Sequence, residues 1–460
     1  MTGADRFAPI RGRRVLVYGV GVAGASAAHA LLAGGADVGL VDHKEPNAVR
    51  ELLAAGARWL GAPPQLPDEV DLVVVSPGVR PDDPLLAQAA ARGLSVWGEI
   101  ELAWQLRGPA PAPWLALTGT NGKTTTVRML ESILRAAGRR AAAVGNVGVP
   151  VIDALVRGEH DVFAVELSSQ QLHFAPSITP AAGALLNLAP DHLDWHGSFE
   201  AYARAKTAIW RGGVAIGNAD DDVVARLMTE RARAVGFTLG VPGHGQLGIV
   251  NGRLTSNAFG GDGVELADVA AVRPAGRHNV ANALAAAGLA LAHGVPAGAI
   301  AEGLRAFVPD RHRNEVVLER GGIRWVDDSK ATNPHAAAAS LAAYPRVVWV
   351  AGGQLKGVDV DELVRRFADR LVAAVLLGAD RAVLATSLAR HASEVPVITI
   401  DSTDDGAMTE VVAAAAGFAR PGDTVLLAPA GASYDMFANY GARGDAYAAA
   451  ARALAGGEGQ

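Results

Sequence analysis

A glycine-rich loop between an apolar strand and a helix limits the possible folds more than any other feature of the chain. Residues 118–125 read Thr-Gly-Thr-Asn-Gly-Lys-Thr-Thr and follow the apolar segment 114–118. Glycines let backbone N–H groups approach phosphate oxygens, and the start of the following helix favours anions. Lys123 would reach the terminal phosphates of a nucleotide, and the hydroxyl of Thr124 would ligate Mg²⁺. The loop therefore predicts a phosphate-binding α/β domain.

The loop departs from the usual phosphate-binding pattern at one position. Leu117 stands where the first glycine of that pattern is expected. The alternative is a glycine-rich turn that only caps a helix. Lys123 favours the phosphate loop over this alternative.

The chain is too long, at 460 residues, for a single ordinary core. A proline-rich segment at 108–113 and a break in the pattern at 307–310 divide it into three parts, each with alternating strands and helices. We expect an α/β protein of three domains: Rossmann-like over 1–110, central P-loop ATPase-type over 111–309, and Rossmann-like again over 310–460. The predicted strands are 14–20, 37–42, 72–76, 114–118, 161–166, 184–187, 323–326, 347–350, 374–377, 397–400 and 424–427, and the clearest predicted helix is 279–292.

Composition excludes several classes of function. Cysteine is absent, so disulfides, thiolate nucleophiles and thiolate metal sites are excluded. A net charge of -6 argues against a general nucleic-acid binder. No apolar run approaches the roughly 18 residues of a membrane span, and no export signal is evident. We therefore expect a cytoplasmic protein that is not inserted in a membrane.

Lysine is rare enough to be informative. The chain has five lysines, because arginine fills nearly every other cationic position. A surviving lysine is a candidate for point-charge contact with phosphate or for amine chemistry, which a guanidinium does poorly. The five are Lys44, Lys123, Lys206, Lys330 and Lys356.

The first segment carries a dinucleotide-binding fingerprint. Gly19, Gly21 and Gly24 follow a predicted strand in the spacing G-x-G-x-x-G, and Asp42 ends the next strand. By itself this pattern fits a nicotinamide-dependent oxidoreductase as well as any other diphosphate ligand.

The second segment places acidic residues and histidines after its strands. Glu166 ends an apolar run, where it would be either a metal ligand or a helix cap. The loop 187–196 contains two acids and two histidines, among them His192, for which a solvated loop histidine is the alternative. Lys206 follows on a predicted helix and would otherwise be a surface lysine. Asn279 and Asn282, in 276–282, suit nucleotide contacts, with helix capping by Asn279 as the alternative.

The third segment has three polar loops that each follow a strand. They are 327–333, 352–356 and 430–435. Polar turns at the carboxyl ends of strands usually line a site, so the three loops could converge on one ligand.

Taken in order, these motifs resemble the Mur ligases over nearly the whole chain. The matching segments are Gly-Thr-Asn-Gly-Lys-Thr-Thr at 119–125, Glu-Leu-Ser-Ser at 166–169, Asn-x-x-x-Asp-His-Leu-Asp at 187–194, the helical Lys206, Gly-x-His-Asn-x-x-Asn at 276–282, and Asp-Ser-Lys-Ala-Thr-Asn at 328–333. The glycine fingerprint and the closing Ala-Ser-x-Asp-x-Phe at 432–437 are similar to the D-glutamate-adding members.

The resemblance implies an ATP-dependent, amide-forming ligase of peptidoglycan precursor synthesis. Such a ligase phosphorylates the alanine carboxylate of UDP-N-acetylmuramoyl-L-alanine and joins D-glutamate to it. Two Mg²⁺ ions and a carbamylated lysine would assist. We expect a monomer that acts on small molecules and closes its domains around them.

The resemblance also assigns residues to each ligand. For the UDP substrate they are Gly21, Val22, Ala23, Asp42, Ser76, Gly78 and Asn146. For ATP they are Gly119, Thr120, Asn121, Gly122, Lys123, Thr124, Thr125, Asn279, Asn282, Arg313 and Asp328. For metal they are Thr124, Glu166, His192 and carbamylated Lys206, and the catalytic residues are Lys123, Glu166, His192 and carbamylated Lys206. For D-glutamate they are Lys330, Thr332, Lys356, Ser433 and Tyr440.

Three positions depart from the family pattern. His43 and Lys44 stand where these ligases often have Thr-Arg, next to the expected uracil contact, and Tyr434 stands where an aliphatic residue is common. The alternatives are a sister ligase that adds L-glutamate to the same acceptor, folylpolyglutamate synthase, an NAD-dependent oxidoreductase and a non-catalytic nucleotide-binding regulator.

Overall fold

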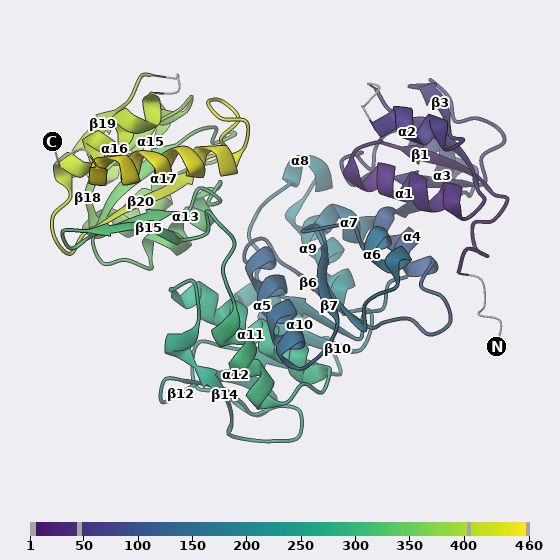
Figure 1. Cartoon of the computed structure of the whole chain (residues 1–460), viewed down its shortest axis with the longest axis horizontal. Coiled ribbons are helices and arrows are strands. Elements are labelled where there is room, and N and C mark those ends of the chain that lie inside the picture. Colours follow the sequence, from purple (N-terminus) through teal and green to yellow (C-terminus); the bar gives the residue numbers. More distant parts are fainter. Residues whose placement is uncertain (1–5, 44–47, 403–405, 457–460) are drawn as a thin grey trace. The chain divides into compact units, whose positions relative to one another are not determined.

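The computed structural model describes residues 6–43, 48–402 and 406–456. They form three β-sheets with helices packed against them, which confirms the predicted α/β class (Figure 1). The chain divides into two compact units, Met1–Val272 with Ala281–Phe307, and Arg273–Val280 with Val308–Gln460. Each strand predicted from the sequence is present, with ends that differ by no more than three residues.

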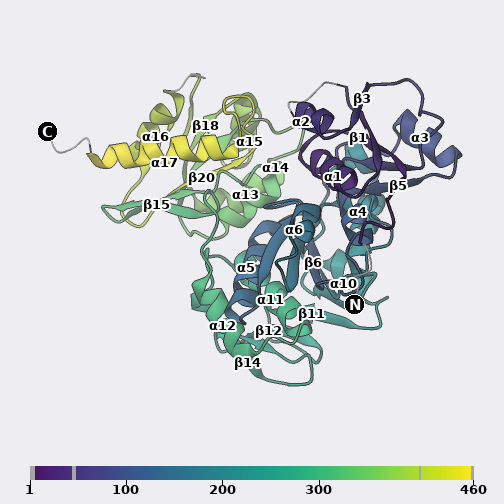
Figure 2. The same ribbon diagram turned by 45° about the vertical axis from the view of Figure 1, so that its right-hand side comes forward.

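The first unit begins with a five-stranded parallel sheet of order β3-β2-β1-β4-β5. Its strands are β1 (Arg14–Tyr18), β2 (Asp37–Val41), β3 (Arg58–Gly61), β4 (Leu72–Val75) and β5 (Ser95–Gly98). Alternate strand residues enter two different cores, because successive side chains of a strand point to opposite faces. Helices α1 (Val22–Ala33), α2 (Ala48–Ala54) and α4 (Glu99–Gln105) cover one face and α3 (Pro84–Ala91) the other (Figure 2).

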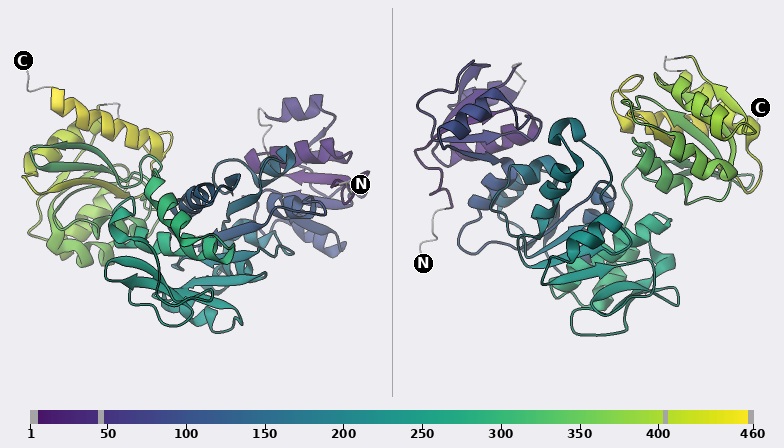
Figure 3. Two further views of the ribbon diagram at one scale, coloured as in Figure 1. Left: turned by 60° about the horizontal axis from the view of Figure 1, so that its bottom comes forward. Right: turned by 180° about the vertical axis from the view of Figure 1, so that it is seen from behind.

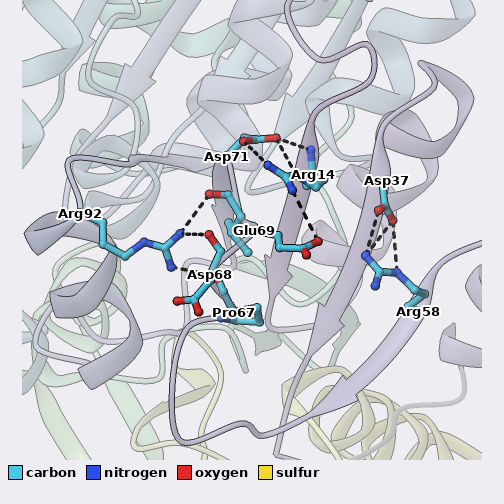
Figure 4. A network of polar contacts seen from close by, with 9 residues as sticks. Arg14, Asp37, Arg58, Pro67, Asp68, Glu69, Asp71 and Arg92 are labelled. Atoms are coloured by element: carbon cyan, nitrogen blue, oxygen red, sulfur yellow. Dashed lines mark hydrogen bonds and ion pairs between the residues drawn. The ribbon is translucent and has the colours of Figure 1, made fainter.

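Surface ion pairs join the amino ends of these strands (Figure 4). Arg14 contacts Asp71, and Arg58 contacts Asp37 through a hydrogen bond of 2.9 Å. Arg92 donates to backbone carbonyls, including that of Asp68 at 2.7 Å. These groups lie at the amino ends of the strands, and the glycine fingerprint of this sheet lies at the opposite, carboxyl ends. The ion pairs therefore support the sheet and leave the carboxyl ends of its strands open to ligands. Such exposed pairs contribute little to stability.

A nine-stranded sheet forms the rest of the first unit, in the order β14-β13-β12-β11-β10-β9-β6-β8-β7. Its strands are β6 (Trp114–Thr118), β7 (Ala141–Gly145), β8 (Val162–Glu166), β9 (Ala182–Leu185), β10 (Val214–Asn218), β11 (Ala234–Phe237), β12 (Gln246–Val250), β13 (Arg253–Ser256) and β14 (Val264–Asp268). All neighbouring strands from β7 to β12 in this order pair in parallel. β13 pairs antiparallel with both β12 and β14. β6 lies between β8 and β9, so loops from three neighbouring strands meet at its carboxyl end.

Helices accompany the strands of this sheet. They are α5 (Lys123–Ala136), α6 (Val151–Arg157), α7 (Ser169–His173), α8 (Leu193–His196), α9 (Phe199–Thr207), α10 (Asp222–Met228), α11 (Arg277–Ala292) and α12 (Ala297–Ala306), and of these α8 has no buried residue. α12 lies so close to α5 that a Cβ at Gly303 would come within 2.4 Å of the Ile133 backbone. The helix that follows the phosphate loop, α5, is therefore packed tightly against α12.

The second unit holds a six-stranded sheet of order β15-β16-β20-β17-β18-β19. Its strands are β15 (Glu315–Arg320), β16 (Ile323–Asp327), β17 (Val347–Gly352), β18 (Leu371–Leu377), β19 (Val397–Thr399) and β20 (Thr424–Ala430), with only β15 antiparallel. One face is covered by α13 (Pro334–Leu341), α14 (Asp361–Phe367) and α15 (Arg381–His391), the other by α16 (Ala407–Phe418) and α17 (Tyr440–Gly456). Figure 3 shows this part of the chain, coloured green to yellow, from two further directions. Among the described residues, no helix combines the length and apolarity needed to cross a membrane.

Candidate active site

The glycine-rich loop connects β6 to α5, as the sequence predicts. Gly122 forms the N-cap of α5 with φ of +82°, a left-handed conformation that favours glycine. A Cβ at Gly119 would come within 2.9 Å of the Leu186 side chain. The loop therefore needs glycine at both positions. Its backbone N–H groups can then point into the space in front of the first turn of α5.

Leu117 has a structural reason to replace the first glycine of the usual pattern. It is fully buried in β6, where it pairs with Glu166 on one side and Ala184 on the other. The strand therefore continues one residue further before the loop begins, and a side chain there packs into the core.

Asn187, which follows the neighbouring strand β9, holds the glycine-rich loop through two hydrogen bonds. The backbone N–H of Asn121 donates to Oδ1 of Asn187 at 2.8 Å, and Nδ2 of Asn187 donates back to the Asn121 carbonyl at 3.0 Å. The ammonium of Lys123 donates to the carbonyls of Gly119 and Thr120, each at 2.9 Å. The cation is therefore held over the loop, and Thr124 lies half-buried beside it in the first turn of α5.

Glu166 ends β8 and is held by a residue of the preceding loop. Asn146 donates to Oε1 of Glu166 through its side chain and to the Glu166 carbonyl through its backbone, both at 2.9 Å. The second carboxylate oxygen, Oε2, is buried and has no hydrogen-bond partner among the described residues. The following helix, α7, is capped by Ser168, so the alternative of Glu166 as a helix cap is wrong.

Lys206 is buried, which contradicts the alternative of a surface lysine. It lies on α9 with 2% of its surface exposed, and its ammonium donates to Thr118 Oγ1 at 3.1 Å and to the Gly119 carbonyl at 2.8 Å. Burial, and then the charge of Lys123, lower its pKa well below the ordinary value of a lysine. An amine that loses its proton readily can react, whereas a guanidinium here could not.

The loop after β9 brings the acids and histidines to the same edge. His192 is exposed in a left-handed conformation with φ of 51°, and its Nε2 lies 3.7 Å from Asp191. His196 shares a hydrogen bond of 2.9 Å with the Ser169 hydroxyl. Burial, followed by the nearby histidines and lysine, lowers the pKa of His196 to about 4, so His196 is neutral at physiological pH.

Several of the predicted residues meet in one cavity. It has a volume of about 280 Å³ and is lined by Gly78 of the first sheet and by Lys123, Asn146, His192 and Lys206 of the second. Residues assigned separately to phosphate, metal and UDP substrate thus face a common space within the first unit.

The glycine fingerprint of the first sheet has the expected geometry. Gly19 has φ of +87°, and a Cβ at Gly24 would come within 1.9 Å of the Gly19 carbonyl oxygen. Oδ2 of Asp42 accepts a hydrogen bond from the Val20 N–H at 2.8 Å, which closes the turn. Ser76 follows β4 and donates its backbone N–H to the carbonyl of Tyr18.

Gly21, Val22 and Ala23 begin α1 at the carboxyl edge of the same sheet. Loops from β1 and β4 flank the point where the strand order reverses, which is where open α/β sheets bind ligands. Lys44 lies outside the described residues.

Of the ATP residues, Asn282 belongs to the first unit, and Asn279, Arg313 and Asp328 belong to the second. α11 begins at Arg277, which leaves Asn279 inside its first turn, so the capping alternative is wrong. Asp328 is half-buried and accepts a hydrogen bond from Ser340; desolvation of its carboxylate raises the pKa of Asp328 to about 6. A cavity of about 810 Å³ in the second unit is lined by Arg313 and by the segments on both sides of it.

The three polar loops of the third segment do follow β16, β17 and β20. The ammonium of Lys330 lies 4.0 Å from the centre of the Tyr440 ring. Lys356 adopts a left-handed conformation with φ of 55°, Thr332 is half-buried, and Ser433 is buried. Tyr434, by contrast, is 69% exposed, so its side chain points to solvent.

Arg443 is a residue that the sequence analysis missed. It lies on α17 with 1% of its surface exposed, and it donates hydrogen bonds of 2.9–3.3 Å to Ser329 and to the carbonyls of Gly352 and Gly431. One guanidinium thus joins all three loops. Burial lowers its pKa to about 10.

His312 is a second missed residue. Its Nδ1 lies 2.7 Å from Asp327, which is fully buried at the end of β16. Nothing in the sequence distinguishes Arg443 from the many other arginines, whereas His312 immediately precedes the predicted Arg313.

Three family models match the chain in succession. They are the Mur ligase MurD-like N-terminal domain at residues 13–98, the Mur ligase middle domain at 117–290, and the Mur ligase glutamate ligase domain at 312–431.

Curated relatives match over nearly the full length. UDP-N-acetylmuramoylalanine–D-glutamate ligase of Thermobifida fusca is 55% identical, with 97% of this chain and 100% of the relative covered. The ligase of the same name from Streptomyces avermitilis is 54% identical, with 96% and 99% covered.

Solved structures share the fold at lower identity. The UDP-N-acetylmuramate-alanine ligase MurC of Thermotoga maritima gives a TM-score of 0.58 at 18% identity, with 96% of this chain and 99% of that chain covered. A pseudomurein peptide ligase type C from Methanothermus fervidus gives 0.54 at 20% identity, with 90% and 96% covered.

Proposed function

The chain belongs to the Mur ligase family, and we propose that it joins D-glutamate to UDP-N-acetylmuramoyl-L-alanine with hydrolysis of ATP. The curated relatives at 54–55% identity carry this activity in their names. A nicotinamide-dependent oxidoreductase, which the first segment alone would fit, leaves the phosphate loop and its neighbouring lysine without a role.

One observation carries the proposal: Lys123, Asn146, His192 and Lys206 line a single cavity. The carboxyl ends of β6, β8 and β9 are adjacent in the sheet, so the phosphate loop, Glu166 and the His192 loop start from neighbouring positions. This arrangement suits transfer of a phosphoryl group from ATP to an acceptor carboxylate.

The donor set at this edge fits Mg²⁺. Oε2 of Glu166 is a buried carboxylate oxygen with no hydrogen-bond partner among the described residues, and such an oxygen is costly unless it meets a cation. We propose that Thr124, Glu166 and His192, with modified Lys206, hold two Mg²⁺ ions. When bound, the ions would neutralise the phosphate and carboxylate charges and bring the reactants together.

The reaction would proceed in two steps. A carboxylate oxygen of the substrate's alanine attacks the γ-phosphorus of ATP, the bond to the β-phosphate oxygen breaks, and ADP leaves. The amine of D-glutamate then attacks the acyl carbon, phosphate leaves with the electron pair of the C–O bond, and the nitrogen loses a proton. Lys123 would hold the β- and γ-phosphates throughout, because its ammonium already lies over the loop.

Lys206 would carry a carbamate. Its neutral amine adds to CO₂, which forms a C–N bond and releases one proton. The product is an anion, and the cationic surroundings set by Lys123 favour it. The low pKa and deep burial of Lys206 support this step, because only the neutral amine is a nucleophile.

The substrate sites are assigned as the resemblance implies. Loops from β1 and β4, with Gly21, Val22, Ala23, Asp42, Ser76 and Gly78, would bind the UDP part, and Asn146 would face the same substrate. Asn279, Asn282, Arg313 and Asp328 would bind ATP. Lys330, Thr332, Lys356, Ser433 and Tyr440 would bind D-glutamate.

We also propose the three domains 1–110, 111–309 and 310–460, each built on one of the three sheets. A monomer in the cytoplasm, where ATP and UDP-linked precursors are made, suits these substrates.

A heavy-oxygen label tests the mechanism. UDP-N-acetylmuramoyl-L-alanine labelled in both alanine carboxylate oxygens is turned over with ATP, Mg²⁺ and D-glutamate. An acyl phosphate transfers one labelled oxygen to the released phosphate, which mass spectrometry detects. Unlabelled phosphate together with amide product would contradict this route.

A further inference from the structure

Glu99 is a buried glutamate outside the site described above. It is the first residue of α4, which connects the first sheet to the second, and 3% of its surface is exposed. Its Oε1 accepts a hydrogen bond of 2.8 Å from the backbone N–H of Ile152. Ile152 lies in the first turn of α6, so Glu99 binds the start of a helix that is distant in sequence.

α6 depends on this contact for its capping. The first N–H groups of a helix have no partner within the helix, and a side chain usually supplies one. The N-cap of α6 is Pro150, which provides no side-chain cap. Glu99 therefore takes the place of the missing cap.

A second contact ties α6 to the sheet that carries the glycine fingerprint. Ser26 on α1 donates to Oδ2 of Asp153 on α6 at 2.8 Å. α1 begins at Val22, next to the expected UDP site. The position of α6 is thus set by two elements of the UDP-binding part of the chain.

The loop that enters α6 leads directly to the metal ligand. It runs from Gly145 to Pro150, and its Asn146 forms two hydrogen bonds to Glu166. A Cβ at Gly145 would come within 2.3 Å of the Glu166 carbonyl oxygen, so the loop and Glu166 are in close contact. A shift of α6 would move one end of this short loop and with it Asn146.

We propose that Glu99 is a positioning residue, which fixes α6 and thereby places Asn146 against Glu166 and the UDP substrate. This role rests on the proposed ligase function. It makes the geometry of the Mg²⁺ site depend on the junction between the UDP-binding and ATP-binding parts of the chain.

The test compares variants of the full chain at two buried glutamates of the same helix. Glu99→Ala removes the acceptor for Ile152. Glu101→Ala is the matched control, because Glu101 is 1% exposed and accepts from Ser177 and Gln105 but not from α6. Glu99→Gln keeps an oxygen acceptor and is the conservative variant.

Three quantities are measured: the dissociation constant for UDP-N-acetylmuramoyl-L-alanine by calorimetry without ATP, the Mg²⁺ concentration for half-maximal rate, and kcat at saturation. In Glu99→Ala we expect the dissociation constant and the Mg²⁺ concentration to rise about tenfold, as for loss of a hydrogen bond to a charged group. We expect kcat to change less than about threefold, Glu99→Gln to recover most of the loss, and Glu101→Ala to lower only the melting temperature.

Any one of three results would overturn the role of Glu99. They are unchanged constants for substrate and Mg²⁺ in Glu99→Ala, an equal rise of these constants in Glu101→Ala, and constants in Glu99→Gln as high as those in Glu99→Ala. If Glu99→Ala does not fold, Glu99→Asp replaces it, because the shorter side chain withdraws the carboxylate from Ile152. A smaller rise in the same two constants supports the role, and no rise overturns it. A wild-type chain without ligase activity would instead remove the proposed function itself.

Discussion

Asn146 donates its side-chain amide to one oxygen of the Glu166 carboxylate at 2.9 Å, and the other oxygen stays buried without a hydrogen-bond partner among the described residues. The amide orients the carboxylate so that a single oxygen is left for a cation. This pairing predicts that Asn146, which is assigned to the UDP substrate, also affects the proposed metal site.

Replacing Asn146 by alanine should therefore weaken Mg²⁺ binding. We expect the Mg²⁺ concentration for half-maximal rate to rise about 10–100-fold, the usual effect of losing a hydrogen bond to a metal ligand. Titrating Mg²⁺ in a phosphate-release assay measures it. An unchanged Mg²⁺ requirement would contradict the pairing.

Replacing Lys206 by arginine should remove most of the activity. The guanidinium keeps the positive charge but cannot form a carbamate, so added bicarbonate should not restore the rate. Rates are measured with and without bicarbonate, and circular dichroism checks that the variant is folded. Full activity in Lys206→Arg would exclude the carbamate.

Replacing Arg443 by lysine should raise the KM for D-glutamate about tenfold. A lysine ammonium cannot reproduce the planar set of hydrogen bonds to Ser329, Gly352 and Gly431, so the three loops lose their common anchor. Arg420→Lys serves as control, since the Arg420 side chain donates hydrogen bonds to the carbonyls of Gly417 and Ala419 at the end of its own helix. Equal KM values in the two variants would show that Arg443 does not position these loops.

The stability of the chain should depend on Glu99 between pH 4.5 and 7. Burial, and then the charge of Asp153, raise the pKa of Glu99 from 4.5 to about 7, against the effect of the Ile152 amide. Because the folded pKa is raised, the stabilisation is complete below pH 4.5 and is lost as the pH rises through 7.

The full shift corresponds to roughly 3 kcal/mol. Glu99→Gln does not titrate there, so its melting temperature should rise relative to that of the wild type as the pH goes from 5 to 8. A difference that is constant over this range would contradict the raised pKa.

Much of the site could be predicted because the functional loops carry strong local signals. Gly119, Gly122 and Lys123 define the phosphate loop by spacing alone, and the apolar run before Glu166 identified the end of a strand. Strand ends were predicted less well: β9 begins and ends two residues before the predicted 184–187, at Ala182 and Leu185.

The antiparallel edge of the nine-stranded sheet was missed although a signal was present. Asn251 and Gly252 form a two-residue turn between β12 and β13, both with positive φ, of 49° and 74°. Asn-Gly at this position is a strong sign of a hairpin. No local sequence pattern predicts contacts such as the one between Glu99 and Ile152, because they join segments far apart in sequence.

One comparison of acceptor amino acids tests the proposed reaction most directly. Phosphate release from ATP and Mg²⁺ is measured with UDP-N-acetylmuramoyl-L-alanine and D-glutamate, L-glutamate or no amino acid. We expect sustained release with D-glutamate alone. Release with L-glutamate instead would assign the chain to a sister ligase, and no release with either amino acid would contradict the proposed function.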